Sequence, residues 1–442
     1  MEDSLQVSSF CRILQLPTVS RQPGEGTDME PFLATGRLLR ELFPRVHAKC
    51  RLETVGGASL LFTLEGRDPV LAPVMMTAHL DVVPAEDGEG WPFPPFSGTV
   101  SEGRVWGRGA VDYKIGVSAM LQALEQLLEM GFSPERTLYL SFGHDEEVGG
   151  DLGARRITSL LEERGVRLSS VLDEGGYIYD YPWLDREVAV VGLAEKGYLT
   201  LRLIAAGEQG HASVPGTETA CGNLCRALAR LEDHQMEPLL CGPVRMLLEG
   251  TAEMMRHRNE DQDGMIGMLQ RHPSGNALVR TTTAITMMGG STKENIMPSR
   301  PWALVNFRAV PGNGSDVIVA HVRALVEDLG VEVEYEDTRQ IHEPSAVSSC
   351  DSPEYRAIVD ALDEVLPGLP VLPGIFPAAT DSRHYSRITD NVYRFQPVHL
   401  GPRGLSVLHS AGESVSLEDY GTSVEFYGSY IRKVCLDERE RG

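Results

Sequence analysis

Basic residues are scarce in this chain of 442 residues. Lys and Arg total 40 against 63 Asp and Glu, so the formal net charge is -23. A surface this acidic repels phosphate backbones and anionic lipids, and we therefore expect neither nucleic acid nor a membrane as a partner. The sequence also lacks any run approaching the roughly 18 uninterrupted apolar residues that a membrane-spanning helix needs.

Cysteine is sparse and irregularly spaced. The chain has seven cysteines, and no pair has the Cys-x-x-Cys spacing of a zinc or redox site. The N-terminal sequence MEDSLQVSSFCRILQLPTVS shows no basic segment followed by an apolar one, as a secretory signal would. These absences predict a cytoplasmic protein with reduced cysteines.

The remaining composition is that of a globular protein. Hydrophobic residues make up 42% and charged residues 23%, which excludes disorder as the main description. A chain of this length exceeds one ordinary hydrophobic core, so two domains are expected.

Apolar runs and helical patterns alternate in the first part of the chain. Strands are predicted at Val70–Thr77, Arg136–Phe142 and Ser169–Leu172, with helices at Ile115–Met130 and Asp151–Arg164. Such alternation predicts an α/β domain with a mostly parallel sheet.

The pattern changes near residue 194 and returns to the α/β style after about residue 341. The segment between reads strand, helix, insert, strand, strand, helix, strand, which matches a split βαβ (ferredoxin-like) unit. We therefore predict an α/β catalytic domain at 1–194 and 341–442, interrupted by an inserted α+β domain at 195–340. Residues 235–275, rich in methionine, carry no clear assignment.

Acidic and histidine side chains follow the predicted strands at their carboxyl ends. These residues are His79, Asp81, Asp112, Glu146, Glu147 and Asp173. Each has a simpler interpretation by itself, such as a helix cap or a solvated charge. Together, several carboxylates at one sheet edge would repel one another unless a cation lay among them.

Imidazole and carboxylate are ligands that suit Zn²⁺, and one carboxylate can bridge two ions. A neighbouring carboxylate that is not a ligand can then take the proton of the attacking water. The adjacent pair Glu146 and Glu147 is suited to dividing these two tasks. The residues therefore predict a dinuclear zinc hydrolase.

Six segments in order resemble those of the aminoacylase, carboxypeptidase S and carboxypeptidase G2 family, peptidase family M20. They are TAHLDVVP (77–84), GRGAVDYK (107–114), GHDEEVGG (143–150), LDEGG (172–176), GHASVP (210–215) and TDSRHY (380–385). GHDEE and LDEGG, with RTTTA (280–284) and VNFR (305–308), are most similar to the branch of carboxypeptidase S and the N-fatty-acyl-amino-acid synthase/hydrolase.

The resemblance implies a zinc-peptidase-type α/β catalytic domain with two Zn²⁺ per subunit, for which Co²⁺ or Mn²⁺ can substitute. His79 and Asp173 would hold one ion, Glu147 and His409 the other, and Asp112 would bridge them. Glu146 would be the general base. Asp81 would orient the imidazole of His79.

Two positions depart from the family pattern. His409 stands in Leu408-His409-Ser410-Ala411-Gly412-Glu413, where relatives often show His-Gly, and His399 and His384 are the alternative ligands. Tyr113 follows the bridging Asp112, whereas the family commonly has Asp or a smaller residue there, joined by a cis peptide. The resemblance leaves open whether this cis bond is kept.

The inserted domain would act as a lid and a dimerisation surface, so a homodimer is expected. His211 resembles the lid histidine that stabilises the oxyanion. Arg383 would hold the free carboxylate of the substrate, because a planar guanidinium can bind it with two hydrogen bonds. Arg308 and Asn276 are predicted as further substrate contacts.

The sequence thus predicts a zinc-dependent hydrolase that cleaves an amide bond to an amino acid with a free carboxylate, as an aminoacylase does. Its substrate would be an N-acyl amino acid or a short peptide. The alternatives are a carboxypeptidase or dipeptidase of the same family and, from another class, an inactive dimeric binding or scaffold protein. The methionines of residues 235–275 favour an apolar acyl site only weakly, because methionine at such spacing is more often plain core.

Overall fold

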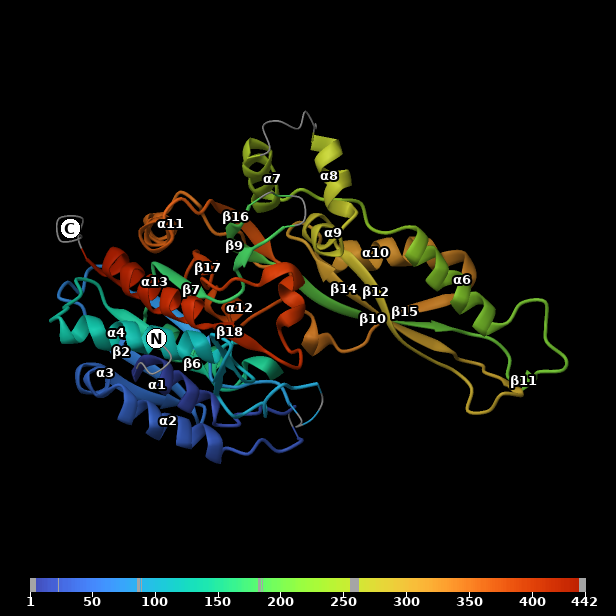
Figure 1. The fold of residues 1–442 in the computed structure, drawn as a ribbon. Helices are drawn as coiled ribbons and strands as arrows, with labels where there is room; N and C mark the ends of the chain where they lie inside the picture. The colour runs from blue at the N-terminus through green and yellow to red at the C-terminus, as the bar shows by residue number, and fades with distance from the viewer. Residues whose placement is uncertain are drawn as a thin grey trace. The chain divides into compact units, whose positions relative to one another are not determined.

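The computed structural model describes residues 5–22, 24–85, 88, 90–181, 184, 186–254 and 262–436. The chain divides into two compact units (Figure 1). Unit 1 comprises residues 1–193, 348–373 and 380–442, and unit 2 comprises residues 194–347 and 374–379. The second break lies at 347/348 rather than at the predicted 340/341, and the sequence did not suggest that residues 374–379 group with unit 2.

A large mixed sheet forms the centre of unit 1, in the order β1-β2-β6-β3-β7-β17-β9-β16 with β8 paired to β9. A smaller sheet has the order β18-β5-β4. The strands are β1 Arg51–Val55, β2 Ser59–Leu64, β3 Val74–His79, β4 Thr99–Ser101, β5 Arg104–Trp106, β6 Leu138–Gly143, β7 Ser170–Asp173, β8 Ile178–Tyr179, β9 Val188–Glu195, β16 Val371–Phe376, β17 Val392–Arg394 and β18 Ser414–Ser416.

The prediction of a mostly parallel sheet holds only for its centre, where β6, β3, β7 and β17 are parallel neighbours. Strands β1, β2 and β6 pair in antiparallel fashion, as β17 and β9 also do. Only residues 56–58 separate β1 from β2, which is too short for a parallel crossover of about a dozen residues. The first of them, Gly56, has a positive φ of 63° that this tight turn requires.

Helices cover the large sheet. They are α1 Leu5–Leu14, α2 Glu30–Leu42, α3 Pro44–Lys49, α4 Lys114–Glu129, α5 Ala154–Glu163, α11 Pro353–Val365, α12 Ser382–Tyr385 and α13 Leu417–Cys435, with 3₁₀ turns η1 Glu146–Val148 and η4 Gly401–Val407. Helix α4 packs on β3 and against α13, while α5 and α12 pack together against β6 and β7. All six residues of β3 are buried.

Unit 2 contains the predicted ferredoxin-like arrangement. Its antiparallel sheet has the order β12-β14-β10-β15 and is accompanied by a small β11-β13 pair. The strands are β10 Gly197–Ala205, β11 Gly210–His211, β12 Thr282–Gly289, β13 Ile296–Met297, β14 Trp302–Ala309 and β15 Val331–Tyr335. The helices are α6 Ala220–Asp233, α7 Gly242–Met254, α8 Gln262–Gln270, α9 Pro273–Val279 and α10 Ser315–Val326, with 3₁₀ turns η2 Glu327–Leu329 and η3 Thr338–Gln340.

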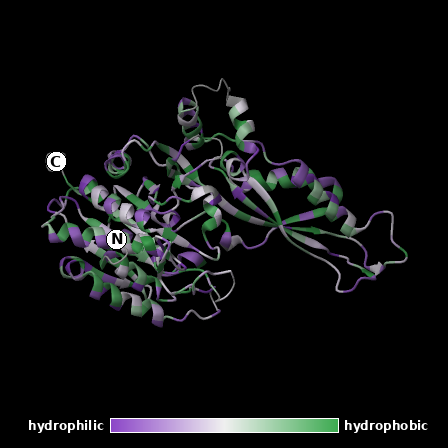
Figure 2. Cartoon of the chain, in the orientation of Figure 1, coloured by the Kyte–Doolittle hydropathy of each residue, from purple (hydrophilic) through white to green (hydrophobic). Residues whose placement is uncertain are grey.

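One face of the unit 2 sheet packs on α6 and α10. Leu199, Leu201 and Leu203 of β10 lie on that face in a buried hydrophobic cluster with residues of both helices. Hydrophobic and hydrophilic residues alternate along the same helices in Figure 2, as expected of helices that cover a sheet with one face. The opposite face of β10 and β14 carries Tyr198, Thr200 and Arg308.

The methionine-rich insert forms helices α7, α8 and α9, which the sequence did not predict. Met236, Met265 and Met268 are 6%, 5% and 6% exposed, so these side chains belong to the core of unit 2. Met255 lies outside the described residues. The buried positions favour the structural interpretation of these methionines over an acyl-binding one.

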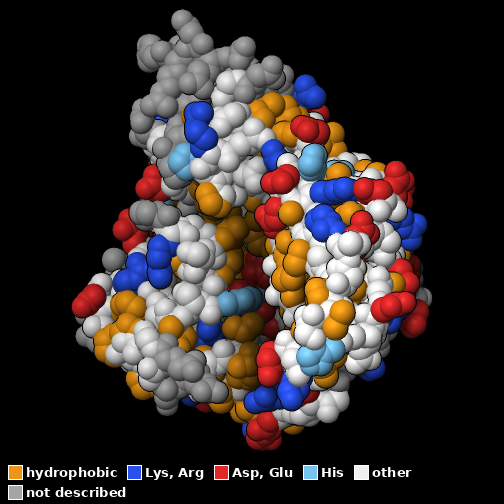
Figure 3. Space-filling view, turned by 90° about the vertical axis from the view of Figure 1, so that its right-hand side faces the viewer, with side chains coloured by type: hydrophobic (Ala, Val, Ile, Leu, Met, Phe, Trp, Pro, Cys, Tyr) orange, Lys and Arg blue, Asp and Glu red, His pale blue; other side chains and the backbone are white. Residues whose placement is uncertain are grey.

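Among the described helices, none is long and apolar enough to cross a membrane. On the face shown in Figure 3, acidic and basic side chains are interspersed with hydrophobic and uncharged ones. The described part of that face carries no continuous basic strip of the kind that follows a phosphate backbone.

Candidate metal centre

The carboxyl ends of the parallel strands of unit 1 bring histidine and carboxylate side chains together. β3 ends at His79, β7 ends one residue before Glu174, and β6 leads into η1 with Glu146 and Glu147. Asp112 directly precedes Tyr113 and helix α4. Ligands of open α/β sheets bind at this edge of the strands.

Asp112 lies between two histidines and faces one with each carboxylate oxygen. Its Oδ1 is 3.1 Å from Nε2 of His79, and its Oδ2 is 2.9 Å from Nε2 of His409. Glu174 Oε1 lies 3.3 Å from His79 Nε2, and Glu147 Oε2 lies 3.3 Å from His409 Nε2. The arrangement is therefore two similar donor sets that share Asp112.

The two sets differ in exposure. The side chains of His79, Glu174, Glu147 and Asp112 are 2%, 7%, 7% and 11% exposed, whereas that of His409 is 51% exposed. The group His79, Asp112 and Glu174 and the group Asp112, Glu147 and His409 each bring their donor atoms within 4.8 Å of one another. The second set lies at the accessible side of the cluster.

Of the predicted metal ligands, the structure brings together His79, Asp112, Glu147 and His409, but not Asp173. The Asp173 carboxylate accepts a hydrogen bond of 2.9 Å from the hydroxyl of Thr380. Glu174, the first residue after β7, takes the place beside His79 that the sequence analysis gave to Asp173. The motif LDEGG signals an acidic ligand but does not distinguish its two adjacent acids.

The alternative histidines lie elsewhere. His399 Nδ1 is 2.5 Å from Asp419 Oδ1, and His384 Nε2 is 3.0 Å from the carbonyl oxygen of Gly149. His409 itself has a positive φ of 57°, which is uncommon for a residue other than glycine. Arg108 donates to the carbonyl oxygen of His409 and thereby helps to hold this backbone conformation.

Burial and the neighbouring charges shift the pKa values of the side chains in this cluster. Although burial opposes the change, hydrogen bonds from His409 and His79 lower the pKa of Asp112. Hydrogen bonds to Asp112 and Glu147 raise the pKa of His409 to about 10. Burial raises the pKa of Glu147 and, by a larger amount, that of Glu174. The raised pKa values of Glu147 and Glu174 reflect the cost of burying several carboxylates together, a cost that a bound cation would reduce.

Glu146 stands beside the cluster with His79 and Glu147, whose donor atoms lie within 4.8 Å of one of its own. Burial raises the pKa of Glu146 well above 4.5; His79 opposes this change and Glu147 adds to it. A carboxylate with a raised pKa is suited to accepting and releasing a proton.

Asp81 organises both His79 and the Glu146–Glu147 turn. Its backbone carbonyl accepts a hydrogen bond of 2.9 Å from Nδ1 of His79, which leaves Nε2 directed at Asp112. Its carboxylate accepts hydrogen bonds from the backbone N–H groups of Glu146 and Glu147, at 3.1 and 3.0 Å, and from Ser20. The predicted orienting residue therefore acts on the imidazole mainly through its main chain.

Two further features concern predicted positions in unit 1. The peptide between Asp112 and Tyr113 is cis, which answers the question that the resemblance left open. The Arg383 guanidinium donates to the carbonyl oxygens of Gly149 and Thr380, at 2.7 and 3.1 Å. These contacts use the two terminal nitrogens that the sequence analysis assigned to the carboxylate of a substrate.

The remaining predicted site residues belong to unit 2. His211 lies on β11, where Nδ1 accepts a hydrogen bond of 3.2 Å from the backbone N–H of Ser213. The same Nδ1 lies 2.8 Å from the hydroxyl oxygen of Ser213. Asn276 lies in α9, where its backbone N–H donates to the carbonyl of His272 at 2.8 Å.

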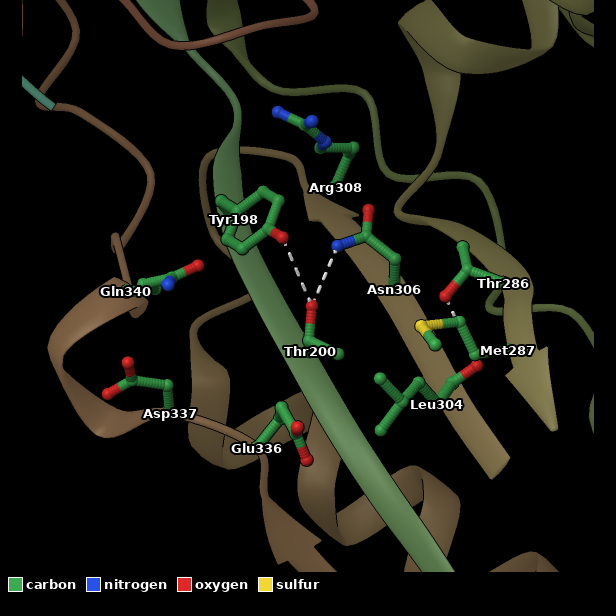
Figure 4. Close-up of a pocket in the computed structure, with 10 residues that line it drawn as sticks. All are labelled: Tyr198, Thr200, Thr286, Met287, Leu304, Asn306, Arg308, Glu336, Asp337 and Gln340. Atoms are coloured by element: carbon green, nitrogen blue, oxygen red, sulfur yellow. Dashed lines mark hydrogen bonds between the residues drawn. The ribbon is translucent and has the colours of Figure 1, made fainter. Parts of the chain in front are cut away.

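Arg308 lies on β14 at a pocket of about 670 Å³ on the open face of the unit 2 sheet, which Glu336 and Asp337 also line (Figure 4). Its guanidinium lies over the ring of Tyr198, 4.6 Å from the ring centroid. Asn306 Nδ2 donates to Thr200 Oγ1 at 2.9 Å along the same pocket. A cation stacked on an aromatic ring beside amide and hydroxyl groups can bind a carboxylate.

Known proteins are similar to this chain over most of its length. Residues 75–433 match peptidase family M20/M25/M40. The chain is 38% identical over 438 residues to the N-fatty-acyl-amino acid synthase/hydrolase PM20D1.1 of Danio rerio, covering 95% of this chain and 84% of that protein. It is 34% identical over 413 residues to the probable carboxypeptidase S-like 2 of Dictyostelium discoideum, covering 91% and 79%.

Solved structures show the same fold. The M20 family metallo-carboxypeptidase Sso-CP2 of Sulfolobus solfataricus superimposes with a TM-score of 0.70 at 18% identity, covering 98% of this chain and 99% of that one. Human carnosine dipeptidase 1 gives a TM-score of 0.67 at 17% identity, covering 97% and 96%. The match to the family and the extent of the curated relatives confirm the resemblance drawn from the sequence and the prediction of an enzyme. The chain belongs to peptidase family M20/M25/M40 and is a metallohydrolase.

Proposed function

We propose that this chain is a two-zinc amidohydrolase that cleaves N-acyl amino acids with a free carboxylate. The observation that carries the proposal is the position of Asp112, whose two oxygens face His79 and His409, each accompanied by a glutamate. We assign His79 and Glu174 to one ion, His409 and Glu147 to the other, and Asp112 to both. Asp173 is replaced by Glu174 in this assignment.

The residues present fit the ions. The donor set consists of imidazole nitrogens and carboxylate oxygens, which Zn²⁺ prefers, and Co²⁺ or Mn²⁺ accept the same ligands. Within the described chain, Glu147 Oε1 is buried without a hydrogen-bond partner, as expected of an oxygen kept for a cation. Bound zinc would lower the pKa of a water and polarise a carbonyl.

The chain's own groups then supply the proton transfers. Glu146 would accept the proton of the attacking water and donate it to the leaving amine, a role that its raised pKa supports. Asp81 would hold Glu146 in place through the backbone N–H that it binds. His211 would donate its Nε2–H to the oxyanion of the tetrahedral state, from the same chain or from a second copy.

We propose Arg308, rather than Arg383, as the main partner of the free carboxylate. The terminal nitrogens of Arg383 bind the Gly149 and Thr380 carbonyls, whereas Arg308 faces an open pocket. Gly149 closes the η1 turn that bears Glu146 and Glu147, so Arg383 would support this turn. Asn276 remains a proposed further contact.

The relatives support the substrate class. Proteins named N-fatty-acyl-amino acid synthase/hydrolase are 38% and 37% identical to the chain, in Danio rerio and Mus musculus. The carboxypeptidase S-like relative at 34% supports the second candidate, a carboxypeptidase or dipeptidase. An inactive scaffold protein is disfavoured because the two donor sets and Glu146 are all present.

We also propose a homodimer through unit 2. Strand β12 is an edge of its sheet, and Met287 and Met288 on it are 54% and 57% exposed. An apolar edge strand is a site of association. Light scattering after size-exclusion chromatography measures this directly. The cytoplasmic location stays a prediction.

A matched substrate panel tests the proposed reaction. With Zn²⁺ present, mass spectrometry would follow long-chain and acetyl N-acyl amino acids and dipeptides, each with a free and an amidated C-terminus. Preferred cleavage of free-carboxylate N-acyl substrates supports the proposal. Preferred cleavage of dipeptides would instead assign the chain to the peptidases, and no cleavage of either class would favour the scaffold.

A further inference from the structure

A buried ion pair joins the two loops that carry Asp112 and His409. Strand β5 pairs with β18, and the backbone N–H of Gly107 donates to the carbonyl of Glu413 at 3.1 Å. From this ladder the chain runs on one side to Asp112 and on the other back to His409. The side chains of Arg108 and Glu413 lie between the two loops and are 4% and 0% exposed.

The Glu413 carboxylate binds the loop of Asp112 through four donors. Its Oε1 accepts from the backbone N–H groups of Val111 and Asp112, at 2.7 and 3.0 Å. Its Oε2 accepts from the backbone N–H of Gly109 at 3.2 Å and from Arg108 Nη1 at 2.7 Å. One carboxylate thus fixes the direction of the main chain on which Asp112 stands.

Arg108 extends this contact to the loop of His409. Its Nη2 donates to the carbonyl oxygen of His409 at 3.1 Å, and its Nη1 is 3.5 Å from that of Ser410. His409 has a left-handed backbone, which a contact at its own carbonyl helps to hold. The planar guanidinium can bind Glu413 and the His409 carbonyl at once, which an ammonium group cannot do with the same geometry.

We propose that Arg108 and Glu413 are positioning residues that set the separation of Asp112 and His409, and thereby the affinity for the ion bound by His409 and Glu147. This inference rests on the proposed two-zinc function. The pair would act through the backbone of both ligands and would touch neither the ion nor the substrate. Partners of this kind change metal affinity by about 10–100-fold when they are altered.

The variant Glu413→Gln removes the charge while keeping the shape. An amide has one acceptor oxygen and one donor NH₂, so in either orientation its NH₂ faces N–H groups that now bind a carboxylate oxygen. The variant Arg108→Lys keeps a positive charge beside Glu413 but loses the second arm that reaches His409. In both variants the separation of the loops that carry Asp112 and His409 should therefore be less well fixed.

Glu125 offers a matched control in the same unit. Its carboxylate accepts from the backbone N–H groups of Arg45 and Val46, at 3.0 and 2.9 Å, and from the Arg45 guanidinium at 3.3 Å. The environment is chemically similar to that of Glu413 but belongs to α3 and α4. The variant Glu125→Gln should lower stability without changing metal affinity.

The test measures the dissociation constants of Zn²⁺ by competition with a chromophoric chelator, on metal-free full-length protein. Wild type should bind two ions; a wild type that binds none would overturn the proposed function itself. We expect Glu413→Gln and Arg108→Lys to raise the dissociation constant of one of the two ions by about 10–100-fold. Glu125→Gln should match the wild type.

Unchanged dissociation constants in a folded Glu413→Gln variant would overturn the inference while leaving the two-zinc function intact. If that variant does not fold, Arg108→Lys decides by the same criterion. Equal weakening in Glu125→Gln would also overturn it, because general loss of stability would then explain the effect.

Discussion

The Glu174 carboxylate lies 3.3 Å from Nε2 of His79, although its neighbour Asp173 is the last residue of β7. Asp173 instead accepts a hydrogen bond from Thr380. We propose that the two adjacent acids have separate roles, Glu174 as a metal ligand and Asp173 in support of the TDSR segment.

Separate substitutions of the two acids test this division. Glu174→Gln should reduce the zinc content from two ions per chain to one, because a neutral amide is a poor zinc ligand. Asp173→Asn should keep both ions, because its amide oxygen can still accept from Thr380. Metal analysis of dialysed protein gives the answer, and the opposite pattern would restore Asp173 as the ligand.

Glu146→Gln should bind zinc as the wild type does and lose about 10²–10⁴-fold in kcat, since the amide cannot take a proton. Isothermal titration with Zn²⁺ and steady-state kinetics measure the two effects. Glu163→Gln, on the exposed side of α5, is the control. Turnover close to that of the wild type in a zinc-loaded Glu146→Gln variant would remove Glu146 as the base.

The two candidate arginines should differ in what they change. Arg308→Ala should raise KM for free-carboxylate substrates by roughly 10–100-fold, as expected from losing about 1.5–3 kcal/mol of charged hydrogen bonds. It should have little effect on amidated substrates. Arg383→Ala should lower kcat on both substrate types alike, because it supports the Glu146–Glu147 turn. If Arg383→Ala lost activity only on free-carboxylate substrates, Arg383 would again be the residue that binds the substrate carboxylate.

The metal-free protein should show a pH dependence that originates at His409. Its folded pKa of about 10 exceeds the ordinary value of 6.5, so its protonated form stabilises the fold fully below pH 6.5 and this contribution is lost as the pH rises toward 10. Urea unfolding of the metal-free wild type and His409→Gln at several pH values gives the difference in free energy of unfolding. That difference should shrink from pH 6.5 to pH 10; a constant difference would contradict the assignment.

The sequence predicted the strand ends that carry the centre because buried parallel strands are continuous apolar runs with polar residues after them. Val70–Thr77 was placed a few residues early, since Val70 is 88% exposed and the strand begins only after Pro73. Proline lacks the N–H that a central strand would use. Strand β9, Val188–Glu195, was not predicted although its residues are mostly apolar.

Other parts of the site depend on contacts that spacing does not reveal. The hydrogen bond from the Arg383 guanidinium to the carbonyl oxygen of Gly149 joins residues 234 positions apart. The Arg108–Glu413 pair likewise joins residues 305 positions apart. Helices α7, α8 and α9 were not predicted because their apolar residues are interrupted by Gly, Pro and Arg.

The most direct test of the central claim is anomalous diffraction at the zinc absorption edge from crystals of the zinc-loaded protein. The account predicts two peaks about 3.5–4 Å apart, the spacing of two-metal sites, with Asp112 between them, His79 and Glu174 at one and His409 and Glu147 at the other. A single peak, or two peaks that Asp112 does not join, would contradict it.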